Sequence, residues 1–193
     1  MFGGPQGGYG GMQGGYGGGG MQGGYGGGMQ GGYGGGFGGG VNIMPGTPYK
    51  ILSAFDRTFC IDSSQGTFDR GELILYKFHG GSNQLFTFQP SQSVPGSYYI
   101  LNHKDGAVEP AQDNVAKGRQ VWCERKLKQG TQAWKIVPGV GPAQGRGVHL
   151  VMADGPGYCL DINHERYENG SEIITWMCEG KANQTWIVEP HYW

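Results

Sequence analysis

The stretch that decides the fold is Gln184-Thr-Trp186-Ile-Val188-Glu-Pro190, because the chain contains three copies of its pattern. The other two copies are Gln84-Leu-Phe86-Thr-Phe88-Gln-Pro90 and Gln132-Ala-Trp134-Lys-Ile136-Val-Pro138. The glutamines are 48 and 52 residues apart. Alternation of apolar and polar residues is the period of a half-buried strand, and proline fits a strand end. Each copy therefore predicts a short strand that closes a repeated unit.

The residues upstream of each glutamine repeat as well. Every unit opens with a β-rich run, at 49–52, 99–101 and 148–151, and continues to an acidic residue: Asp62, Glu109 or Asp161. A second apolar run ends 14, 15 and 15 residues later, at Tyr76, Glu124 and Trp176, and seven more residues lead to the position before the glutamine. This spacing predicts an all-β fold of three units, about 47–91, 97–139 and 147–191. Each holds about four short strands, about twelve in total, packed around a shared axis.

The chain divides into a low-complexity tail, residues 1–45, and a domain, residues 46–193. Residues 1–40 hold 25 of the 42 glycines, and the first charged side chain is Lys50. Glycine at this density predicts a disordered segment, because ordering it loses too much backbone entropy. The motif MQGGYGG, at Met12, Met21 and Met29, allows two interpretations: a flexible linker, or a segment that self-associates through evenly spaced Tyr, Met and Gln.

Charge and motifs exclude several function classes. A net charge of −1 predicts no general attraction to nucleic acid or anionic membranes. No apolar run is long enough for a membrane span, and the N-terminus does not resemble a secretory signal. We therefore expect a cytoplasmic protein by default, or one exported by another route. The sequence shows no enzyme signature, no cofactor motif and no zinc-type cysteine spacing, which predicts a non-catalytic protein without a metal.

The pattern of Cys-Leu-Asp161, an apolar strand ending in Trp176, and Asn183-Gln-Thr-Trp186 resembles the ricin B-type lectin domain. The resemblance covers about 47–192, and it implies a β-trefoil: six hairpins, of which three close a barrel and three cap it. It also implies that the aromatic residues two positions after each glutamine belong to the core. Among the cysteines, it implies a disulfide between Cys159 and Cys178 in an oxidising compartment; buried free thiols are the alternative.

A sugar site needs a carboxylate that accepts from hydroxyls, an amide, and an aromatic face for C–H groups. The first and third units keep such a set. The resemblance implies that the Asp binds the sugar hydroxyls, that the aromatic residue stacks on the ring, that the Asn makes further hydrogen bonds and that the Gln supports these residues. The sets are Asp62, Tyr76, Asn83 and Gln84, and Asp161, Trp176, Asn183 and Gln184. The alternative is that these Asp and Asn residues only form turns.

The second unit lacks this set, since Glu109, Glu124 and Thr131 replace its members, and we interpret it as scaffold. It carries a basic run that is either a solvated face or a contact for an acidic partner: Lys117, Arg119, Arg125, Lys126, Lys128 and Lys135.

Two functions follow as hypotheses. The first is a bivalent lectin for glycans that end in galactose or N-acetylgalactosamine. The second is a structural protein in which the tail drives assembly and the trefoil is a building block or protein-binding domain. A carbohydrate-targeting module for an enzyme on another chain is a third idea. A trefoil serves many roles, so the fold alone does not decide between them.

Overall fold

Four strands from each repeat build the fold, and within the described residues they number twelve, as predicted. The computed structural model describes residues 41–64, 71–125, 130–140 and 144–192; the predictions for residues 1–40, Lys126 and Lys128 lie outside the described residues. The strands of the three repeats are, in order, β1 (Tyr49–Ser53), β2 (Phe59–Ser63), β3 (Gly71–Lys77) and β4 (Phe86–Pro90); β5 (Tyr98–Asn102), β6 (Gly106–Pro110), β7 (Arg119–Arg125) and β8 (Ala133–Pro138); and β9 (Val148–Met152), β10 (Tyr158–Ile162), β11 (Ser171–Met177) and β12 (Trp186–Pro190).

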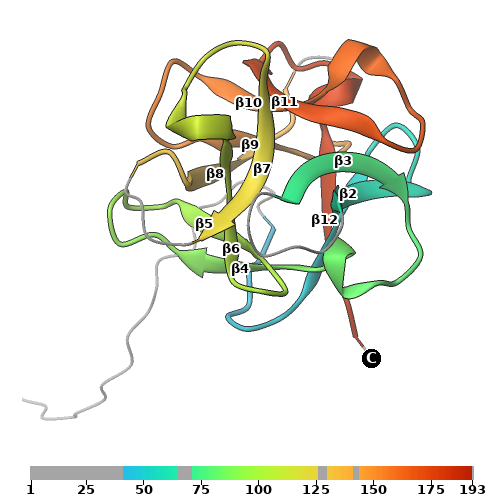
Figure 1. Ribbon diagram of the computed structural model, residues 1–193, viewed down its shortest axis with the longest axis horizontal. Coiled ribbons are helices and arrows are strands. Elements are labelled where there is room, and N and C mark those ends of the chain that lie inside the picture. Colours follow the sequence, from blue (N-terminus) through green and yellow to red (C-terminus); the bar gives the residue numbers. More distant parts are fainter. Residues whose placement is uncertain (1–40, 65–70, 126–129, 141–143, 193) are drawn as a thin grey trace, which may run out of the picture. The chain divides into compact units, whose positions relative to one another are not determined.

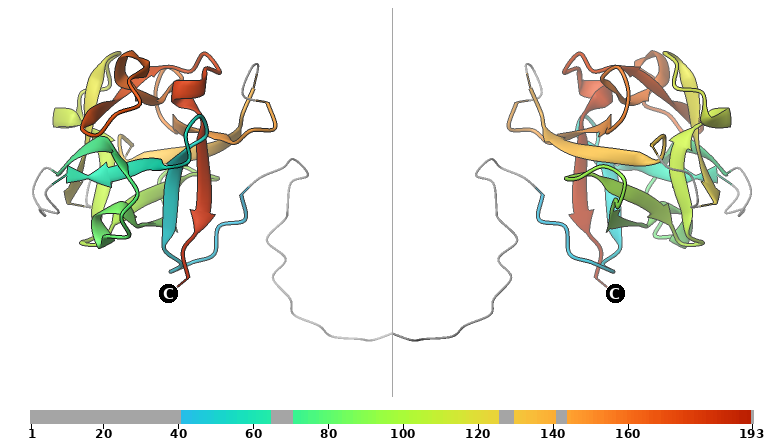
Figure 2. Two further views of the ribbon diagram at one scale, coloured as in Figure 1. Left: turned by 90° about the vertical axis from the view of Figure 1, so that its right-hand side faces the viewer. Right: turned by 90° about the vertical axis from the view of Figure 1, so that its left-hand side faces the viewer.

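The strands pair as six antiparallel hairpin-like pairs. Three of these, β1–β12, β4–β5 and β8–β9, join neighbouring repeats around the chain and close a barrel. The other three, β2–β3, β6–β7 and β10–β11, lie within one repeat, and their second strands also pair with one another. Figure 1 labels these strands, and Figure 2 shows β1 and β12 side by side. This arrangement is a β-trefoil, which confirms the predicted fold.

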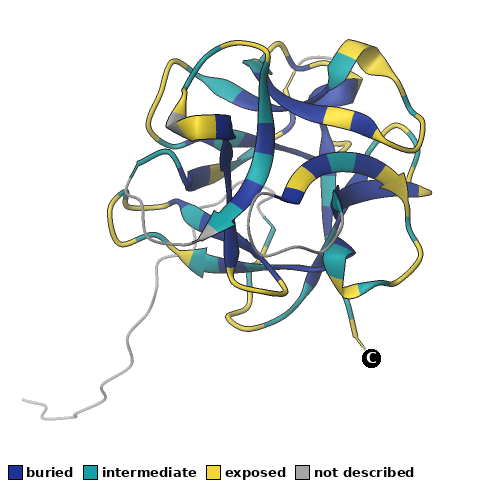
Figure 3. Ribbon diagram, viewed as in Figure 1, coloured by how far each residue is buried: buried dark blue, intermediate teal, exposed yellow. Residues whose placement is uncertain are grey.

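The aromatic residue of each repeated motif lies in the core, as the sequence predicted. Phe86, Trp134 and Trp186 are fully buried. The indole N–H of Trp134 donates to the Val108 carbonyl at 2.8 Å, and that of Trp186 donates to the Leu160 carbonyl at 3.1 Å. Both acceptors lie on the second strand of the same repeat, so each indole joins two strands of its own unit. In Figure 3 buried positions follow the strands, while exposed ones gather in the connections.

Short 3-10 turns connect some strands and carry polar residues. They are η2 (Ser82–Gln84), η3 (Ala111–Asp113), η5 (Asn163–Glu165) and η6 (Ala182–Gln184). The turns η2 and η6 precede the last strand of their repeats and hold the Asn and Gln of the two predicted sites. Within the described residues, no helix is long and apolar enough to cross a membrane.

Candidate functional site

The third repeat brings its predicted polar residues together around one carboxylate. Asp161 lies on β10, and Asn183 and Gln184 lie in η6. The Asn183 Nδ2 donates to Asp161 Oδ1 at 2.9 Å, and the Gln184 Nε2 donates to Asp161 Oδ2 at 2.8 Å. Each carboxylate oxygen thus uses one hydrogen-bond position on the protein and keeps a second for an incoming donor. The carboxylate is therefore fixed in orientation but can still accept from a ligand.

Gln184 supports this arrangement from behind. Its side chain is fully buried, and its Nε2 also donates to the Met177 carbonyl at 2.7 Å. Its Oε1 accepts from the backbone N–H of Glu179 at 2.7 Å. One amide therefore ties Asp161 to the end of β11 and to the turn that follows.

A hollow of about 160 Å³ lies in front of the Asp161 carboxylate. Trp176, on β11, lines it together with Asn183, Glu179 and Lys181. The Oδ1 of Asn183 is buried and has no hydrogen-bond partner within the described residues. The hollow is thus lined by a carboxylate, an amide side chain and a half-buried indole, which are the kinds of group that a sugar ring requires.

Burial governs the charge of this site. Asp161 is only 4% exposed, and burial raises its pKa to about 6. The hydrogen bonds from Gln184 and Asn183 oppose this rise in pKa, while the negative charge of Glu165 adds to it and the positive charge of Lys181 reduces it. The carboxylate is therefore mostly ionised at neutral pH and protonated in mildly acidic solution.

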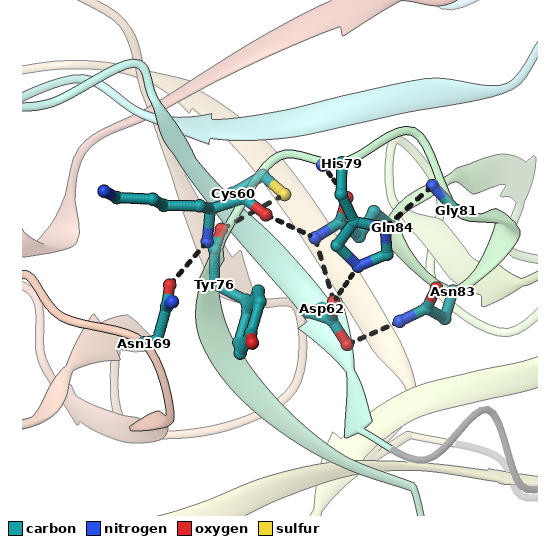
Figure 4. Close-up of polar contacts among 9 residues, drawn as sticks. Cys60, Asp62, Tyr76, His79, Gly81, Asn83, Gln84 and Asn169 are labelled. Carbon is teal, nitrogen blue, oxygen red and sulfur yellow. Dashed lines mark hydrogen bonds and ion pairs between the residues drawn. The ribbon is translucent and has the colours of Figure 1, made fainter.

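The first repeat builds the same contacts around Asp62 on β2 (Figure 4). The Asn83 Nδ2 donates to Asp62 Oδ1 at 2.7 Å, and the Gln84 Nε2 donates to Asp62 Oδ2 at 2.9 Å. Gln84 also donates to the Lys77 carbonyl at 3.0 Å. Tyr76, on β3, is 37% exposed beside them. All four predicted residues of this repeat therefore lie together.

His79 distinguishes the first site from the third, and the sequence alone did not point to it. Its Nε2 lies 3.5 Å from Asp62 Oδ2, and its ring stands edge-on to Tyr76 with centroids 6.0 Å apart. Its backbone N–H donates to Gln84 Oε1 at 2.8 Å, the contact that Glu179 makes in the third repeat. Glu179 instead pairs with Lys181 at 2.7 Å. The sequence could have pointed to His79 only through its position, because His79 and Glu179 each lie five residues before the motif glutamine of their repeat.

The neighbouring repeat borders each of these two sites. In the third, Lys117 from the second repeat places its Nζ 4.0 Å from the centre of the Trp176 ring. In the first, Asn169 from the third repeat accepts from the backbone N–H of Lys77, next to Tyr76, at 2.8 Å. Glycines at positive φ follow both residues, and their N–H groups donate to the adjacent strand: Gly118 to the Thr175 carbonyl and Gly170 to the Leu75 carbonyl.

The second repeat does not reproduce the site. The strand register places Glu124 opposite Ala107, where the other repeats place Tyr76 opposite Cys60 and Trp176 opposite Cys159. Glu109 is fully buried, so its carboxylate is not presented to a ligand at the surface. Of the basic run, Lys135 is exposed on β8, and Lys117 contacts the third site.

All four cysteines are free thiols, and three are buried. Burial raises the pKa of Cys60 and of Cys123 to about 12, as expected of inert core thiols. A hydrogen bond between Cys159 and Cys178 raises the pKa of the first and lowers that of the second. The described residues contain no cluster of ligands able to hold a metal ion.

The twelve described strands form a β-trefoil, and two of its three repeats bring a carboxylate, an amide and an aromatic ring together. The family model described as the ricin-type beta-trefoil lectin domain matches residues 47–186. The chain therefore belongs to this lectin family, which supports carbohydrate binding.

Several solved structures share this fold at low sequence identity. The Rhizoctonia solani agglutinin is 20% identical, with 78% of this chain and 99% of that chain covered and a TM-score of 0.65. The Macrolepiota procera ricin B-like lectin, in complex with lactose, is 19% identical, with 77% and 99% covered and a TM-score of 0.63. The C-terminal half of an earthworm R-type lectin, in complex with GalNAc, is 19% identical, with 75% and 99% covered and a TM-score of 0.56. A search of curated proteins found no match.

Proposed function

We propose that this protein is a non-catalytic, bivalent lectin that binds sugars of the galactose type at the first and third repeats. The observation that carries this proposal is the duplicated hydrogen-bond geometry around Asp62 and Asp161. In both places Asn and Gln hold one carboxylate oxygen each, at 2.7–2.9 Å, beside an accessible aromatic ring. Turn formation alone does not require both a fixed carboxylate and an aromatic ring next to it.

The chemistry of the two sites suits a neutral ring with several hydroxyls. The carboxylate accepts from two hydroxyls, and the ring of Tyr76 or Trp176 stacks on the C–H face of the sugar. The lactose and GalNAc bound by two of the similar lectins are galactose-type ligands, which supports the same class here. With one ring held at each shallow site, we expect a Kd of about millimolar to tens of micromolar for a monosaccharide. Two sites on one domain then raise the avidity for clustered glycans.

A glycan array combined with titration calorimetry tests the proposal. We expect wild type to bind two equivalents of methyl β-galactoside, Asp62→Ala and Asp161→Ala one each, and the double variant none. Lys135→Ala, which removes an exposed charge on β8 away from both sites, is the matched control and should bind like wild type. If wild type binds no glycan at high density, or if the double variant binds as well as wild type, the lectin proposal is wrong.

The absence of catalysis is part of the proposal. Asp62 and Asp161 belong to separate repeats, and each is held by its own Asn and Gln, so the two do not form an acid–base pair with one another. We expect no release of nitrophenol from nitrophenyl galactosides under conditions that saturate both sites. Turnover that disappears in the double variant would contradict this part of the proposal.

For the tail, residues 1–45, we propose that self-association adds to glycan avidity, with residues 46–193 as an independent trefoil. Deletion of residues 1–40 should reduce the sedimentation coefficient at high concentration and weaken binding to dense glycan surfaces. Calorimetric binding of the monosaccharide should not change. Unchanged sedimentation and avidity would leave the tail a plain linker.

A further inference from the structure

A second polar depression adjoins the third site, and the proposed function does not use it. It has a volume of about 450 Å³ and is formed by the connection between β10 and β11. Asn163 and His164 line both this groove and the hollow in front of Asp161, so the two depressions share a wall. The groove therefore begins beside the hollow, at Asn163 and His164.

The groove contains an unused hydrogen-bonding group. Ser171, the first residue of β11, is 8% exposed and lines the groove, yet its Oγ has no hydrogen-bond partner within the described residues. A buried hydroxyl without a partner costs free energy, and native proteins rarely keep one without a reason. A rotation about one side-chain bond is enough to re-aim a serine hydroxyl. After such a rotation, Ser171 can donate to or accept from a group that enters the groove.

The rest of the lining is polar and held in place by its own contacts. The Asn163 Nδ2 donates to Glu172 Oε2 at 2.9 Å, and both residues line the groove. His164 and Glu165 both have φ of 56°, a left-handed conformation that non-glycine residues rarely adopt, so the loop is bent sharply away from an extended path. Arg166, exposed on the same rim, adds planar N–H donors.

The charges of the groove favour a neutral ligand. Arg166 is its permanent cation, whereas Glu168 and Glu172 are both anionic, and Glu165 lies next to them in the loop. A carboxylated or sulfated sugar would meet net negative charge there, which opposes its binding. A neutral pyranose has donors for the glutamates and acceptors for Arg166 and Ser171. The groove thus matches the chemistry of a second uncharged sugar ring.

We propose that this groove is a second subsite, which holds the penultimate neutral sugar of an oligosaccharide whose terminal residue occupies the third site. This inference rests on the proposed lectin function and adds a preference for ligand length. The third repeat then selects oligosaccharides over monosaccharides.

The test uses the full chain with Asp62→Ala, so that calorimetry reports the third site alone. The probes are methyl β-galactoside and three neutral disaccharides, namely lactose, N-acetyllactosamine and galactobiose. We expect at least one disaccharide to bind about tenfold more tightly than the monosaccharide. Arg166→Ala and Ser171→Ala, whose residues line only the groove, should bring that ratio close to one and leave the affinity for methyl β-galactoside unchanged. Lys135→Ala is the matched control and should keep the ratio.

Ser171→Ala separates a binding role from a structural one. Because its hydroxyl has no protein partner, its removal should leave the melting temperature equal or higher. If methyl β-galactoside binds but no disaccharide binds more tightly, or if the gain survives the Arg166→Ala and Ser171→Ala double variant, the groove is not a subsite. If neither the monosaccharide nor any disaccharide binds to the third site, the proposed function itself fails.

Discussion

Acidification should release the sugar from the third site, and the size of the effect follows from one carboxylate. Asp161 must be ionised to accept hydrogen bonds from two sugar hydroxyls, and burial raises its pKa to about 6. One pH unit above that value about nine-tenths of the carboxylate is ionised, and one unit below about one-tenth is. The association constant should therefore fall about tenfold, or about 1.4 kcal/mol, between pH 7 and pH 5.

Stability should respond to pH in the opposite direction at this residue. The pKa of Asp161 in the folded protein lies above its ordinary value of 3.8, so the folded state binds the proton more tightly than the unfolded state. Its contribution to stability is complete below about pH 4 and is lost as the pH rises through about 6. A loss of sugar binding at pH 5 is therefore not explained by unfolding through Asp161.

Calorimetry with methyl β-galactoside on the Asp62→Ala protein, at half-unit steps from pH 7.5 to 4.5, measures the effect. Melting temperatures at each pH provide the control for folding. Glu165→Gln should move the midpoint to lower pH, because the charge of Glu165 raises the pKa of Asp161. Equal affinity at pH 7 and pH 5, or a midpoint that Glu165→Gln does not move, would refute the reasoning.

Three further predictions concern the parts that hold the third repeat together. Trp186→Ala should lower the free energy of unfolding by about 3–5 kcal/mol, measured by urea denaturation, because it empties a fully buried site; a loss below 1 kcal/mol would contradict the core assignment. Gln184→Ala should lower the free energy of unfolding by about 3 kcal/mol, since it removes the hydrogen bonds to Asp161, Met177 and Glu179. It should also abolish sugar binding at the third site while the first site still binds. Retained binding at both sites would show that this support is dispensable. Mild oxidation should join Cys159 and Cys178, detectable by peptide mass spectrometry, and should raise stability by about 3 kcal/mol. Cys178→Ser should not gain stability under the same oxidant, and an oxidised protein without the cross-linked peptide would exclude the pairing.

The sequence predicted the fold, and it indicated which polar residues occupy matching positions in two units, because both features repeat. The motif glutamine precedes a core aromatic in every unit, and Gln84 and Gln184 donate to the Asp on the second strand of their own units. In the strand register, Cys60 lies opposite Tyr76 and Cys159 lies opposite Trp176. Because the register is the same in both repeats, the spacing in the sequence was enough to match the aromatic residues of the two units. A one-residue difference in spacing falls in the connection between the two strands, so it leaves this register unchanged.

The sequence did not predict the contacts that cross between repeats or depend on loop conformation. Lys117 reaches Trp176 only because β7 and β11 pair across two repeats, and no local pattern encodes that pairing. The groove beside the third site depends on the left-handed conformations of His164 and Glu165. Histidine and glutamate rarely adopt this conformation, so the sequence did not predict the bend. The sequence did not point to His79 because the residue at the equivalent position of the third repeat, Glu179, is chemically unlike it.

Lys117 and Asn169 each contact a site that belongs to another repeat. A single sequence repeat is therefore not a complete structural unit of this domain. The second repeat borders the site of the third, and the third repeat borders the site of the first, so either of these sites would be incomplete if its own repeat were transplanted alone. The second repeat, which does not reproduce the site, still contributes Lys117 to the border of the third one. A protein engineered from three copies of the third repeat would place asparagine, rather than lysine, beside every Trp176, and its three identical sites would differ from the natural one.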